Sequence, residues 1–336
     1  MSSDPNVLVD PFGRRVEDLR LSVTDRCNFR CTYCMPAEGL DWLPRSDLLT
    51  YEELARIAQI CVERWAFSGI RVTGGEPTVR AHLPRLFEML APLGVDLAMT
   101  TNGVRLPDLA ADLATAGLRR VNVSLDSLKP DVFERLTRRP DLDKVLAGID
   151  AALAAGLGPV KVNCVVMRGV NDDEVVDLAA FGRDRGIGLR FIEFMPLDAD
   201  GGWNLDQVVP ASEILERIDA VFPLDLAARA HHHDEHVEPA ARFAYRDGVG
   251  DVGVIASVTE PFCGNCDRVR LTAEGKFRTC LFALEEFDLR AQVRAGANDD
   301  DIAATIERAV GTKWAGHRIT KVDFVRPTRS MSQIGG

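Results

Sequence analysis

Two groups of cysteines are the residues of this sequence that are best suited to chemistry. The first group has the spacing C-x3-C-x2-C near the N-terminus, and the second has the spacing C-x2-C-x13-C in the last third of the chain. Closely spaced cysteines outside a secretory context are more often metal or cluster ligands than a disulfide framework. The candidate metal ligands are therefore Cys27, Cys31, Cys34, Cys263, Cys266 and Cys280.

The first group predicts an iron–sulfur cluster rather than a zinc ion. A zinc site mostly uses four protein ligands, or three and a water molecule. Three thiolates suit a [4Fe–4S] cluster in which the protein holds three irons and leaves one open for a small ligand. The group directly follows an expected strand at 19–23, which argues against three incidental cysteines in a loop.

The second group leaves two interpretations open. A structural zinc site would need a fourth ligand, for which His317 or the histidines between His231 and His236 are available. A second cluster with an open iron could instead bind a substrate directly. Arg268 and Arg270 follow this group, and in an extended strand residues i and i+2 point to the same side. Two guanidinium groups on one side would hold an anion by charge-assisted hydrogen bonds.

The order of apolar segments predicts the fold that positions these groups. Strand-like runs alternate with helical patterns, which is typical of a parallel sheet with helices outside it. A closed barrel would have eight strands, but six convincing runs precede a break at about residue 200, so we expect an α/β fold with a partial (β/α)6 TIM-like barrel. The expected strands are 19–23, 69–73, 95–100, 119–125, 160–166 and 189–194, and the expected helices are 50–65, 83–92, 106–116, 143–155 and 172–185.

The chain divides into two unequal parts. Residues 225–240 interrupt the pattern in the manner of a linker, and the segment that follows is shorter and less regular. We expect a barrel domain over 1–230 that holds the first cluster, and a smaller C-terminal domain over 231–336 that holds a second iron–sulfur cluster. The composition of the stretch from His231 to His236 does not assign it a role.

Polar segments follow the expected strands: TDRCN, GGEPT, TNG, DS, MRG and MPLD. In βα barrels the chemistry gathers at the C-terminal ends of the strands, so these segments should meet at one site. The segment GGEP at 74–77 lacks the pattern G-x-x-x-x-G-K-[ST] of a P-loop, and no such pattern occurs in the chain. Any phosphate groups of a ligand must therefore be held by side chains.

The composition is that of a globular protein with a sizeable core. The chain has 336 residues, of which 46% are hydrophobic, and a formal net charge of −11. An acidic chain is a poor general binder of nucleic acid or of anionic membranes, and no apolar run approaches the ~20 residues of a membrane span. The N-terminal segment lacks the pattern of a signal peptide, so we expect a cytoplasmic location.

The first cysteine group and a glycine-containing segment resemble those of the radical S-adenosylmethionine (SAM) superfamily. CNFRCTYC carries the C-x3-C-x2-C motif with an aromatic residue, Tyr33, before the third cysteine, and GGEP is similar to the second signature of the superfamily. The resemblance implies that SAM binds the open iron through its amino and carboxylate groups. It also implies that one electron from the cluster cleaves SAM to a 5′-deoxyadenosyl radical, which the protein must aim at a substrate.

Further motifs resemble one family within this superfamily, the GTP 3′,8-cyclases of molybdenum cofactor biosynthesis. These motifs are RLSVTDRCNFRCTYC, RVTGGEPTVR, TTNG, RRVNVSLDS, RFIEFMP, CGNCDRVRLTAEGKFRTCLF and the terminal GG. The resemblance implies a lyase that removes the ribose 3′ hydrogen of GTP, joins that carbon to C8 of guanine and gives (8S)-3′,8-cyclo-7,8-dihydroguanosine 5′-triphosphate. It implies two [4Fe–4S] clusters and SAM as cofactors, with the open iron of the second cluster on the guanine base.

The same resemblance assigns roles to individual residues. Around SAM it places Tyr33, Gly75, Ser124 and Met195. Around GTP it places Arg20, Arg71, Thr100, Lys161, Arg268, Val269 and Arg270, with Arg190 as a further candidate near the triphosphate. The residues that it implicates in catalysis are Arg20, Arg268, Arg270, Gly335 and Gly336, because the double glycine of this family reaches into the active site.

Partners are also implied by the resemblance. A cyclic pyranopterin monophosphate synthase would act on the product, a reductant protein would supply electrons, and the chain would form a homodimer.

Two other functions compete with the cyclase. One is a radical SAM maturase that acts on a peptide, although the auxiliary domains of such enzymes usually carry more than three cysteines. The other is a zinc-stabilised binding protein without chemistry, which leaves the first cysteine group and GGEP unexplained. Cys61 and Cys164 lie outside both cysteine groups, and we expect them to be small residues of the core.

Overall fold

The protein is described from a computed structural model that covers residues 6–198, 201–227 and 238–335. The stretch from His231 to His236 and the last residue, Gly336, lie outside the described residues. Within the described ranges, eleven strands form one continuous sheet in the order β11-β10-β9-β1-β2-β3-β4-β5-β6-β8-β7.

Six parallel strands form the centre of this sheet, which confirms the sequence prediction. Each strand pairs with the next in sequence, so the order from β1 to β6 is that of the chain. Their bounds are β1 (Asp18–Ser22), β2 (Gly69–Thr73), β3 (Asp96–Thr101), β4 (Arg120–Ser124), β5 (Lys161–Val166) and β6 (Gly188–Glu193).

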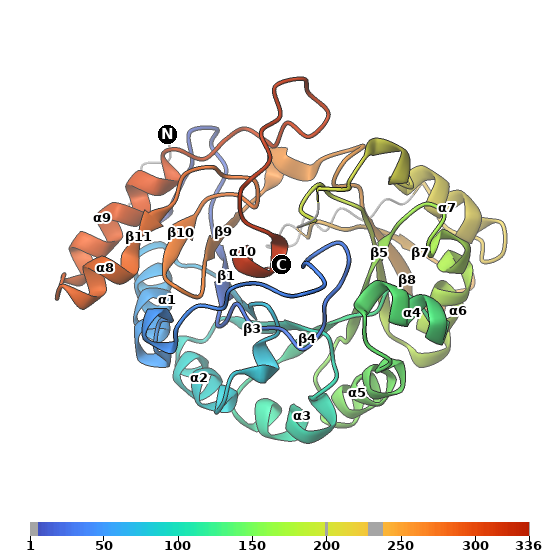
Figure 1. Cartoon of the computed structure of the whole chain (residues 1–336), viewed down its shortest axis with the longest axis horizontal. Helices are drawn as coiled ribbons and strands as arrows, with labels where there is room; N and C mark the ends of the chain where they lie inside the picture. Colours follow the sequence, from blue (N-terminus) through green and yellow to red (C-terminus); the bar gives the residue numbers. More distant parts are fainter. Residues whose placement is uncertain (1–5, 199–200, 228–237, 336) are drawn as a thin grey trace.

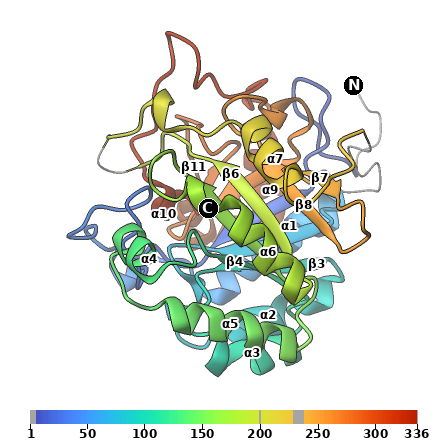
Figure 2. The ribbon, with the colours of Figure 1, turned by 90° about the vertical axis from the view of Figure 1, so that its right-hand side faces the viewer.

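Helices connect these strands and cover the outside of the sheet. In Figure 1 the helices follow the convex side of the curved sheet, whereas α10 and the C-terminus lie in the middle of the ring. Figure 2 shows α2, α3 and α5 together on that outer side. The helices are α1 (Tyr51–Trp65), α2 (Leu83–Leu90), α3 (Leu106–Thr115), α4 (Pro130–Thr137), α5 (Leu142–Ala154), α6 (Val175–Arg185), α7 (Ala211–Asp219), α8 (Leu289–Arg294), α9 (Asp299–Val310) and α10 (Met331–Ile334).

The first helix begins where its sequence predicts. The side-chain oxygen of Thr50 accepts a hydrogen bond from the backbone N–H of Glu53, and the Glu53 carboxylate accepts one from the N–H of Thr50. This capping box satisfies two donors that a helix start leaves free. Leu54, Ile57 and Cys61 then lie on one buried face of the helix. This face is the apolar stripe that the spacing predicts.

The helices α8, α9 and α10 of the C-terminal part were not among those expected from the sequence, and neither were α4 and α7. Each of the last two carries a short apolar stripe: Val132, Phe133 and Leu136 in α4, and Ile214 and Ile218 in α7. Both helices are only two to three turns long, so a periodic signal has few positions in which to repeat.

The C-terminal part adds strands to both edges of the same sheet. β8 (Asp251–Ile255) lies parallel beside β6, and β9 (Arg268–Leu271) lies parallel beside β1. β7 (Ala241–Ala244), β10 (Lys276–Arg278) and β11 (Phe287–Asp288) complete the edges in antiparallel pairs. The six-strand count is therefore extended to eight parallel strands in the described part of the chain. The division at residue 230 stays a prediction.

The core lies between the sheet and the helices. Leu19, Val72, Met99, Val123 and Val162 are fully or almost fully buried on the helix-facing side of five consecutive strands. Alternate residues of those strands then point into the interior of the partial barrel. In the described part of the chain, no helix combines the length and the apolar composition that a membrane span requires.

We predict that Gly148→Ala destabilises the protein even though alanine is the better helix former. Gly148 lies in α5, and a Cβ atom there would be 2.1 Å from the carbonyl oxygen of Gly103, in the loop after β3. The clash should outweigh the ~1 kcal/mol that alanine gains over glycine in a helix. Thermal unfolding of the variant measures this.

The matched control is Ala147→Gly, at an exposed position in the middle of the same helix. It should cost ~1 kcal/mol through helix propensity alone. A Gly148→Ala variant that is more stable than the wild type would contradict the close packing of α5 against the loop.

Candidate active site

A cavity of about 370 Å³ occupies the interior of the partial barrel. It extends from the first cysteine trio, at the C-terminal ends of the strands, to the second trio, which lies at the N-terminal ends near residues that begin strands, such as Asp18, Gly69 and Lys161. The segments after β1, β2, β3 and β4 line it, as the sequence predicts, and so do Met195 after β6 and both cysteine groups. The segment MRG at 167–169, after β5, contributes no residue to the lining, so that part of the prediction is wrong. Two cysteine trios that are more than 200 residues apart in sequence therefore face one space.

Two arginines hold the loop of the first trio by hydrogen bonds to its backbone carbonyl groups. Arg138 donates hydrogen bonds to the carbonyl oxygens of Arg30 and Met35, both at 3.0 Å, and Arg139 donates to that of Asn28 at 3.1 Å. The backbone N–H groups of Arg30 and Thr32 donate in turn to the end of α4. A loop with so many partners keeps its three cysteines oriented toward the cavity.

A second link ties the same loop to the C-terminal ends of two strands. The Tyr33 hydroxyl donates to the carboxylate of Asp126 at 2.5 Å, and the other oxygen of that carboxylate accepts the N–H of Val165 at 2.8 Å. Burial raises the pKa of Asp126 to about 6, and the two hydrogen bonds oppose this rise. Tyr33 thus connects the cysteine loop to the ends of β4 and β5.

The GGEP segment is shaped by its glycines and anchored by its glutamate. A Cβ at Gly75 would lie 2.4 Å from the carbonyl oxygen of Arg26, so only glycine fits against the cysteine loop. The fully buried Glu76 carboxylate accepts hydrogen bonds from Thr78, Thr101 and the N–H of Asn102. The side chain of Glu76, which also lines the cavity, therefore joins the ends of β2 and β3.

The second trio sits between the N-terminal segment and the C-terminal tail. Cys263 lies in a short 3-10 turn over Phe262–Asn265, Cys266 directly follows this turn, and Cys280 follows β10. Arg14 donates to the carbonyl oxygen of Cys263 at 2.5 Å. A Cβ at Gly316 would be 2.9 Å from the Cβ of Cys263, so the tail packs directly on this cysteine.

The electrostatic surroundings of the two trios differ. Burial raises the pKa of the Cys27 thiol to about 12 and that of Cys34 to about 11. Burial also acts on Cys266, but Arg268 and Lys313 outweigh it and lower the pKa of this thiol to about 7. The Arg268 guanidinium lies 3.6 Å from the Cys266 sulfur, and the Lys313 ammonium lies 3.9 Å from it.

Both trios fit an iron–sulfur cluster in their chemistry. All six thiols are free and partly buried, and bound iron would deprotonate the buried thiols of the first trio. N–H donors point at Cys27, Cys266 and Cys280, which is the kind of hydrogen bonding that tunes cluster sulfurs. In the described residues, no three Cys, His, Asp or Glu side chains are grouped so as to bind one metal ion; in a cluster each thiolate binds its own iron.

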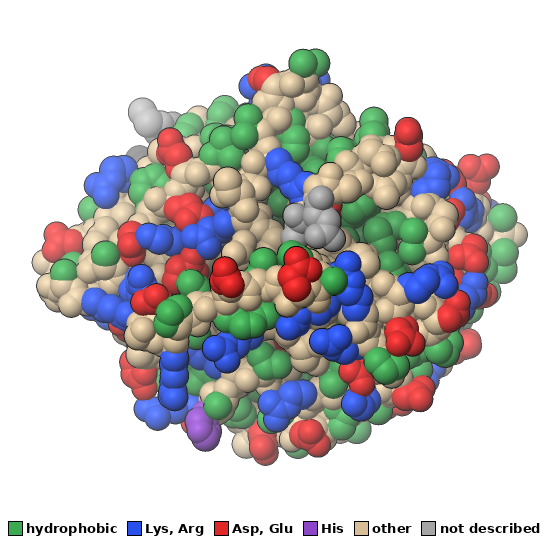
Figure 3. Space-filling model, in the orientation of Figure 1, with side chains coloured by type: hydrophobic (Ala, Val, Ile, Leu, Met, Phe, Trp, Pro, Cys, Tyr) green, Lys and Arg blue, Asp and Glu red, His purple; other side chains and the backbone are tan. Residues whose placement is uncertain are grey.

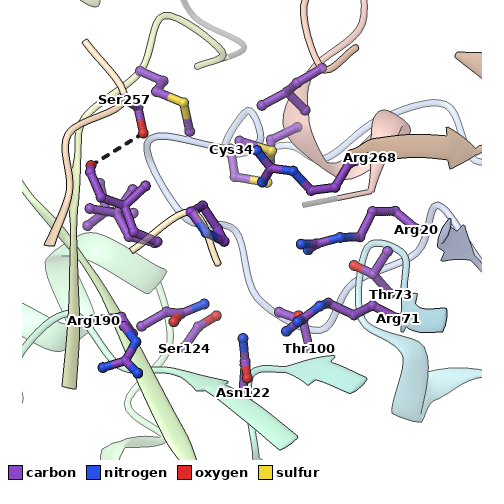
Figure 4. Close-up of a pocket in the computed structure, with 18 of the residues that line it drawn as sticks. Arg20, Cys34, Arg71, Thr73, Thr100, Asn122, Ser124, Arg190, Ser257 and Arg268 are labelled. Carbon is purple, nitrogen blue, oxygen red and sulfur yellow. Dashed lines mark hydrogen bonds between the residues drawn. The ribbon is translucent and has the colours of Figure 1, made fainter. Parts of the chain in front are cut away.

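A row of arginines crosses one wall of the cavity. β1 pairs in register with β9 and β2, which sets Arg20 directly between Arg270 and Arg71. Figure 4 shows Arg20, Arg71 and Arg268 pointing into the same space. Burial and the neighbouring Arg20 lower the pKa of both Arg71 and Arg270 to about 9. Crowded, buried guanidinium groups of this kind form a receptor for a polyanion.

The opposite wall carries polar groups and three more cations, Arg120, Lys161 and Arg190. Thr100 and Asn122 are in register on β3 and β4, and Asn122 is in register with Lys161 on β5. Arg190 on β6 reaches the cavity because its neighbour on β8 is Gly253, where a Cβ would lie 2.5 Å from the Arg190 side chain. Arg71 Nε and Asn122 Oδ1 are buried without a hydrogen-bond partner among the described residues.

The structure places the residues predicted for the site as follows. The cavity is lined by all six cysteines and by Tyr33, Gly75, Ser124, Met195, Arg20, Arg71, Thr100, Lys161, Arg190, Arg268 and Arg270. The side chain of Val269 is fully buried in the core instead. Gly335 is close to the cavity, since its carbonyl oxygen accepts a hydrogen bond of 2.6 Å from Arg270. Gly336 lies outside the described residues.

Several cavity residues escaped the sequence analysis. Asp126 and Asn163 line the cavity beside Ser124, and His317 lies against Phe282 near the second trio. Asp126 stands in the polar segment LDS after β4, so its position was a usable signal. The sequence offers His317 only as a fourth zinc ligand, because nothing in it shows that the C-terminal tail folds back onto the second trio. Cys61 and Cys164 are buried in the core, as predicted.

The chain was compared with known families and proteins. The Radical SAM superfamily matches residues 21–182, and the family called Molybdenum Cofactor Synthesis C matches residues 187–319. A GTP 3′,8-cyclase of Paenarthrobacter nicotinovorans is 50% identical over 98% of this chain and 97% of the relative. The GTP 3′,8-cyclase of Streptomyces coelicolor is 50% identical over 98% of this chain and 97% of its own length.

The chain belongs to the GTP 3′,8-cyclase family. A cyclase of this family from Rhodopirellula baltica is 46% identical over 99% of this chain and 93% of the relative. The family resemblance expected from the sequence is confirmed, and with it the use of SAM and an iron–sulfur cluster, which is the chemistry of the radical SAM superfamily.

Solved structures show the same fold at low sequence identity. Streptococcus suis SuiB bound to S-adenosylmethionine has a TM-score of 0.59 at 13% identity, over 88% of this chain and 68% of that one. Native anSMEcpe with bound AdoMet has a TM-score of 0.54 at 14% identity, over 93% of both chains. These matches confirm the partial barrel of the cyclase family member described here.

We predict that Glu76→Gln destabilises the protein and weakens SAM binding. Both carboxylate oxygens of Glu76 accept hydrogen bonds from hydroxyl or N–H donors. The NH₂ group of a glutamine would replace one of these acceptors by a donor, and the hydrogen bonds to that oxygen would be lost. The loss should be ~2–4 kcal/mol, since hydrogen bonds to charged groups contribute more than neutral ones. Thermal unfolding and equilibrium dialysis of labelled SAM measure the two effects. Glu88→Gln, at an exposed position of α2, is the control and should change neither.

Proposed function

We propose that this chain carries out the GTP 3′,8-cyclase reaction with both cysteine trios and the arginine row in one active site. The observation that carries the proposal is the in-register alignment of Arg270, Arg20 and Arg71 along a cavity that both trios line. A triphosphate needs several cations, and the family motifs supply them without a P-loop.

The first trio would hold the cluster that binds SAM. Gly75 brings the GGEP backbone close to the cysteine loop, and Tyr33, Ser124 and Met195 line the adjoining part of the cavity. When bound, SAM and this cluster supply a carbon-centred radical that can remove a hydrogen atom from GTP. The task of the chain is to orient both molecules and to exclude water from the space between them.

The second trio would hold a second [4Fe–4S] cluster, at the end of the cavity where Arg268 follows Cys266. Arg268 and Lys313 stabilise the thiolate form of Cys266, which prepares this residue as a ligand. An open iron there would receive the guanine base, with Arg268 and the backbone of Val269 beside it. The Val269 side chain lies in the core, so only its main chain could contact the nucleotide.

The arginine row and the opposite wall would share the triphosphate. Arg20, Arg71 and Arg270 approach from one side, and Lys161 and Arg190 approach from the other, with Thr100 between them. The lowered pKa values of Arg71 and Arg270 reflect burial and mutual repulsion, and both effects diminish when an anion binds between these groups.

The C-terminal tail would close the site. Arg270 donates to the carbonyl of Gly335, and Figure 1 shows α10 and the C-terminus in the middle of the ring of strands. Gly335 has φ of 89°, a conformation that glycine adopts without strain. We therefore keep Gly335 and Gly336, with Arg20, Arg268 and Arg270, as the candidate catalytic residues.

The remaining parts of the proposal come from the family. A cyclic pyranopterin monophosphate synthase would take the product, a reductant protein would supply electrons, and the chain would act as a homodimer in the cytoplasm. The region 1–230 would carry the SAM cluster and 231–336 the second cluster. On the face of the molecule in Figure 3, Lys and Arg side chains are interspersed with Asp and Glu, an arrangement that does not favour nucleic acid.

A peptide-modifying radical SAM enzyme is the second candidate. The similarity to SuiB supports this candidate, but the sequence identity is 13% and the similarity concerns the fold alone. A neutral peptide would leave the buried arginine row without counter-charges, whereas a triphosphate would supply them.

The decisive test is an anaerobic incubation of the reconstituted protein with SAM, a reductant and GTP. We expect about eight irons per chain without stoichiometric zinc, strong stimulation of 5′-deoxyadenosine formation by GTP, and consumption of GTP to a cyclised product. Chromatography with mass spectrometry measures both products. If ATP or a peptide gave this stimulation and GTP did not, the proposal would be wrong.

A second test separates the two trios. Cys263→Ala should leave the SAM cluster intact, with about four irons per chain, and abolish GTP turnover. Electron paramagnetic resonance of the reduced protein with and without SAM reports the remaining cluster. Cys61→Ala is the control, because this thiol lies in the core away from the cavity, and its iron content should be unchanged. Normal GTP turnover by Cys263→Ala would remove the second trio from the mechanism.

A further inference from the structure

Glu238 places a carboxylate inside the cationic part of the cavity. Its Oε1 atom accepts a hydrogen bond from the ammonium group of Lys161, and its Oε2 atom lies 3.7 Å from a guanidinium nitrogen of Arg190. Both cations are among those assigned to the triphosphate. An acidic side chain at this position is unexpected in a cavity for a polyanion, because like charges repel.

Three further carboxylates that pair with cations of the cavity walls belong to strands. Asp18 on β1 pairs with Arg20, Asp96 on β3 pairs with Arg120, and Asp251 on β8 pairs with Arg190. Each is part of a strand whose ladder hydrogen bonds fix its backbone.

Glu238 differs from them because it precedes the edge strand β7 and belongs to no strand. Its side chain is 31% exposed, although its Oε2 atom is buried. It can therefore leave Lys161 without breaking the sheet.

The fit of this carboxylate to the two cations is incomplete. Oε2 is buried and has no hydrogen-bond partner among the described residues, and its distance of 3.7 Å from Arg190 is too long for a hydrogen bond. A phosphate group carries more charge and three acceptor oxygens. It could bond to Lys161 and Arg190 at once, which the carboxylate does not.

We propose that Glu238 is an internal counter-anion that occupies a phosphate position of the substrate site and is displaced when the triphosphate enters. The proposal rests on the proposed function, since it takes Lys161 and Arg190 as triphosphate ligands. Without substrate, Glu238 keeps the buried ammonium of Lys161 paired, and an unpaired buried charge is costly. With substrate, only an anion that binds both cations more strongly than Glu238 replaces it, which favours highly charged nucleotides over weakly charged ones.

The pKa values agree with this role. Burial would raise the pKa of Glu238, but Lys161, Arg190 and Arg242 outweigh it and the pKa is lowered, so the side chain is an anion at neutral pH. Burial is likewise the largest influence on Lys161 and lowers its pKa, and Glu238 opposes that change.

The experiment measures binding to the reconstituted protein for Glu238→Gln and Glu238→Asp. Glutamine keeps the shape and removes the charge, so no ion pair has to be broken before the anion binds. We expect GTP and inorganic tripolyphosphate to bind about ten-fold more tightly to Glu238→Gln, which is ~1.4 kcal/mol, and guanosine to bind unchanged. Glu238→Asp keeps the charge and should remain near the wild type. The KM for GTP should fall while kcat stays within about two-fold, as expected for a change in ground-state binding.

Thermal unfolding gives an independent readout. Without ligand, Glu238→Gln should be less stable than the wild type, because Lys161 loses its counter-ion; with saturating GTP the difference should vanish. Asp247→Asn is the control, because Asp247 is an exposed carboxylate that pairs with Arg183 away from the cavity. It should change neither affinity nor the effect of GTP on stability.

The outcomes separate this proposal from the proposed function. If the wild type bound neither GTP nor tripolyphosphate, the assignment of the cavity to a triphosphate would fall, and the role of Glu238 with it. If the wild type bound both ligands but Glu238→Gln bound them equally or more weakly, only the counter-anion role would be wrong. Weaker binding would mean that Glu238 contacts the substrate complex, for example through a divalent cation.

Discussion

The parallel pairing of β1 with β9 is the constraint on which the rest of the site depends. This pairing joins a strand near the N-terminus to one that lies about 250 residues later, and its register puts Arg270 directly beside Arg20. The next pair, β1 with β2, adds Arg71 to the row. The backbone hydrogen bonds of the sheet thereby fix the backbone positions of the three arginines. The sheet keeps these residues adjacent although their guanidinium groups repel one another.

The same pairing brings the two cysteine trios to one cavity. The first trio follows the C-terminal end of β1, whereas Cys263 and Cys266 precede β9 and Cys280 follows the antiparallel β10. The two trios therefore lie at opposite ends of neighbouring parallel strands and face the cavity between them. Buried acidic side chains then hold the loops in place: Glu76 joins the ends of β2 and β3, and Glu193 accepts N–H groups from Val258 and Thr259 in the segment before the second trio. These carboxylates are structural, although each one borders the cavity or a segment that lines it.

Charge compensation inside the barrel links structure to function. Asp18, Asp96 and Asp251 partly neutralise the cations of the walls and are fixed on strands. Glu238 is the one of these paired carboxylates, among the described residues, that lies on a connecting segment. A site that must stay folded without substrate and still bind a polyanion needs some anion that can be exchanged, and the position of Glu238 meets that requirement.

The sequence by itself determined the six central strands, five of the helices and the family. The period of apolar residues was enough for the six strands and for α1 with its capping box, and the spacing of CNFRCTYC with GGEP was enough for the superfamily. Local patterns cannot report which distant segments pair, because strand order and register depend on contacts between residues far apart in the chain. The tertiary structure alone decided that β8 and β9 extend the sheet, that Val269 faces the core while Arg268 and Arg270 face the cavity, and that Glu238 meets Lys161.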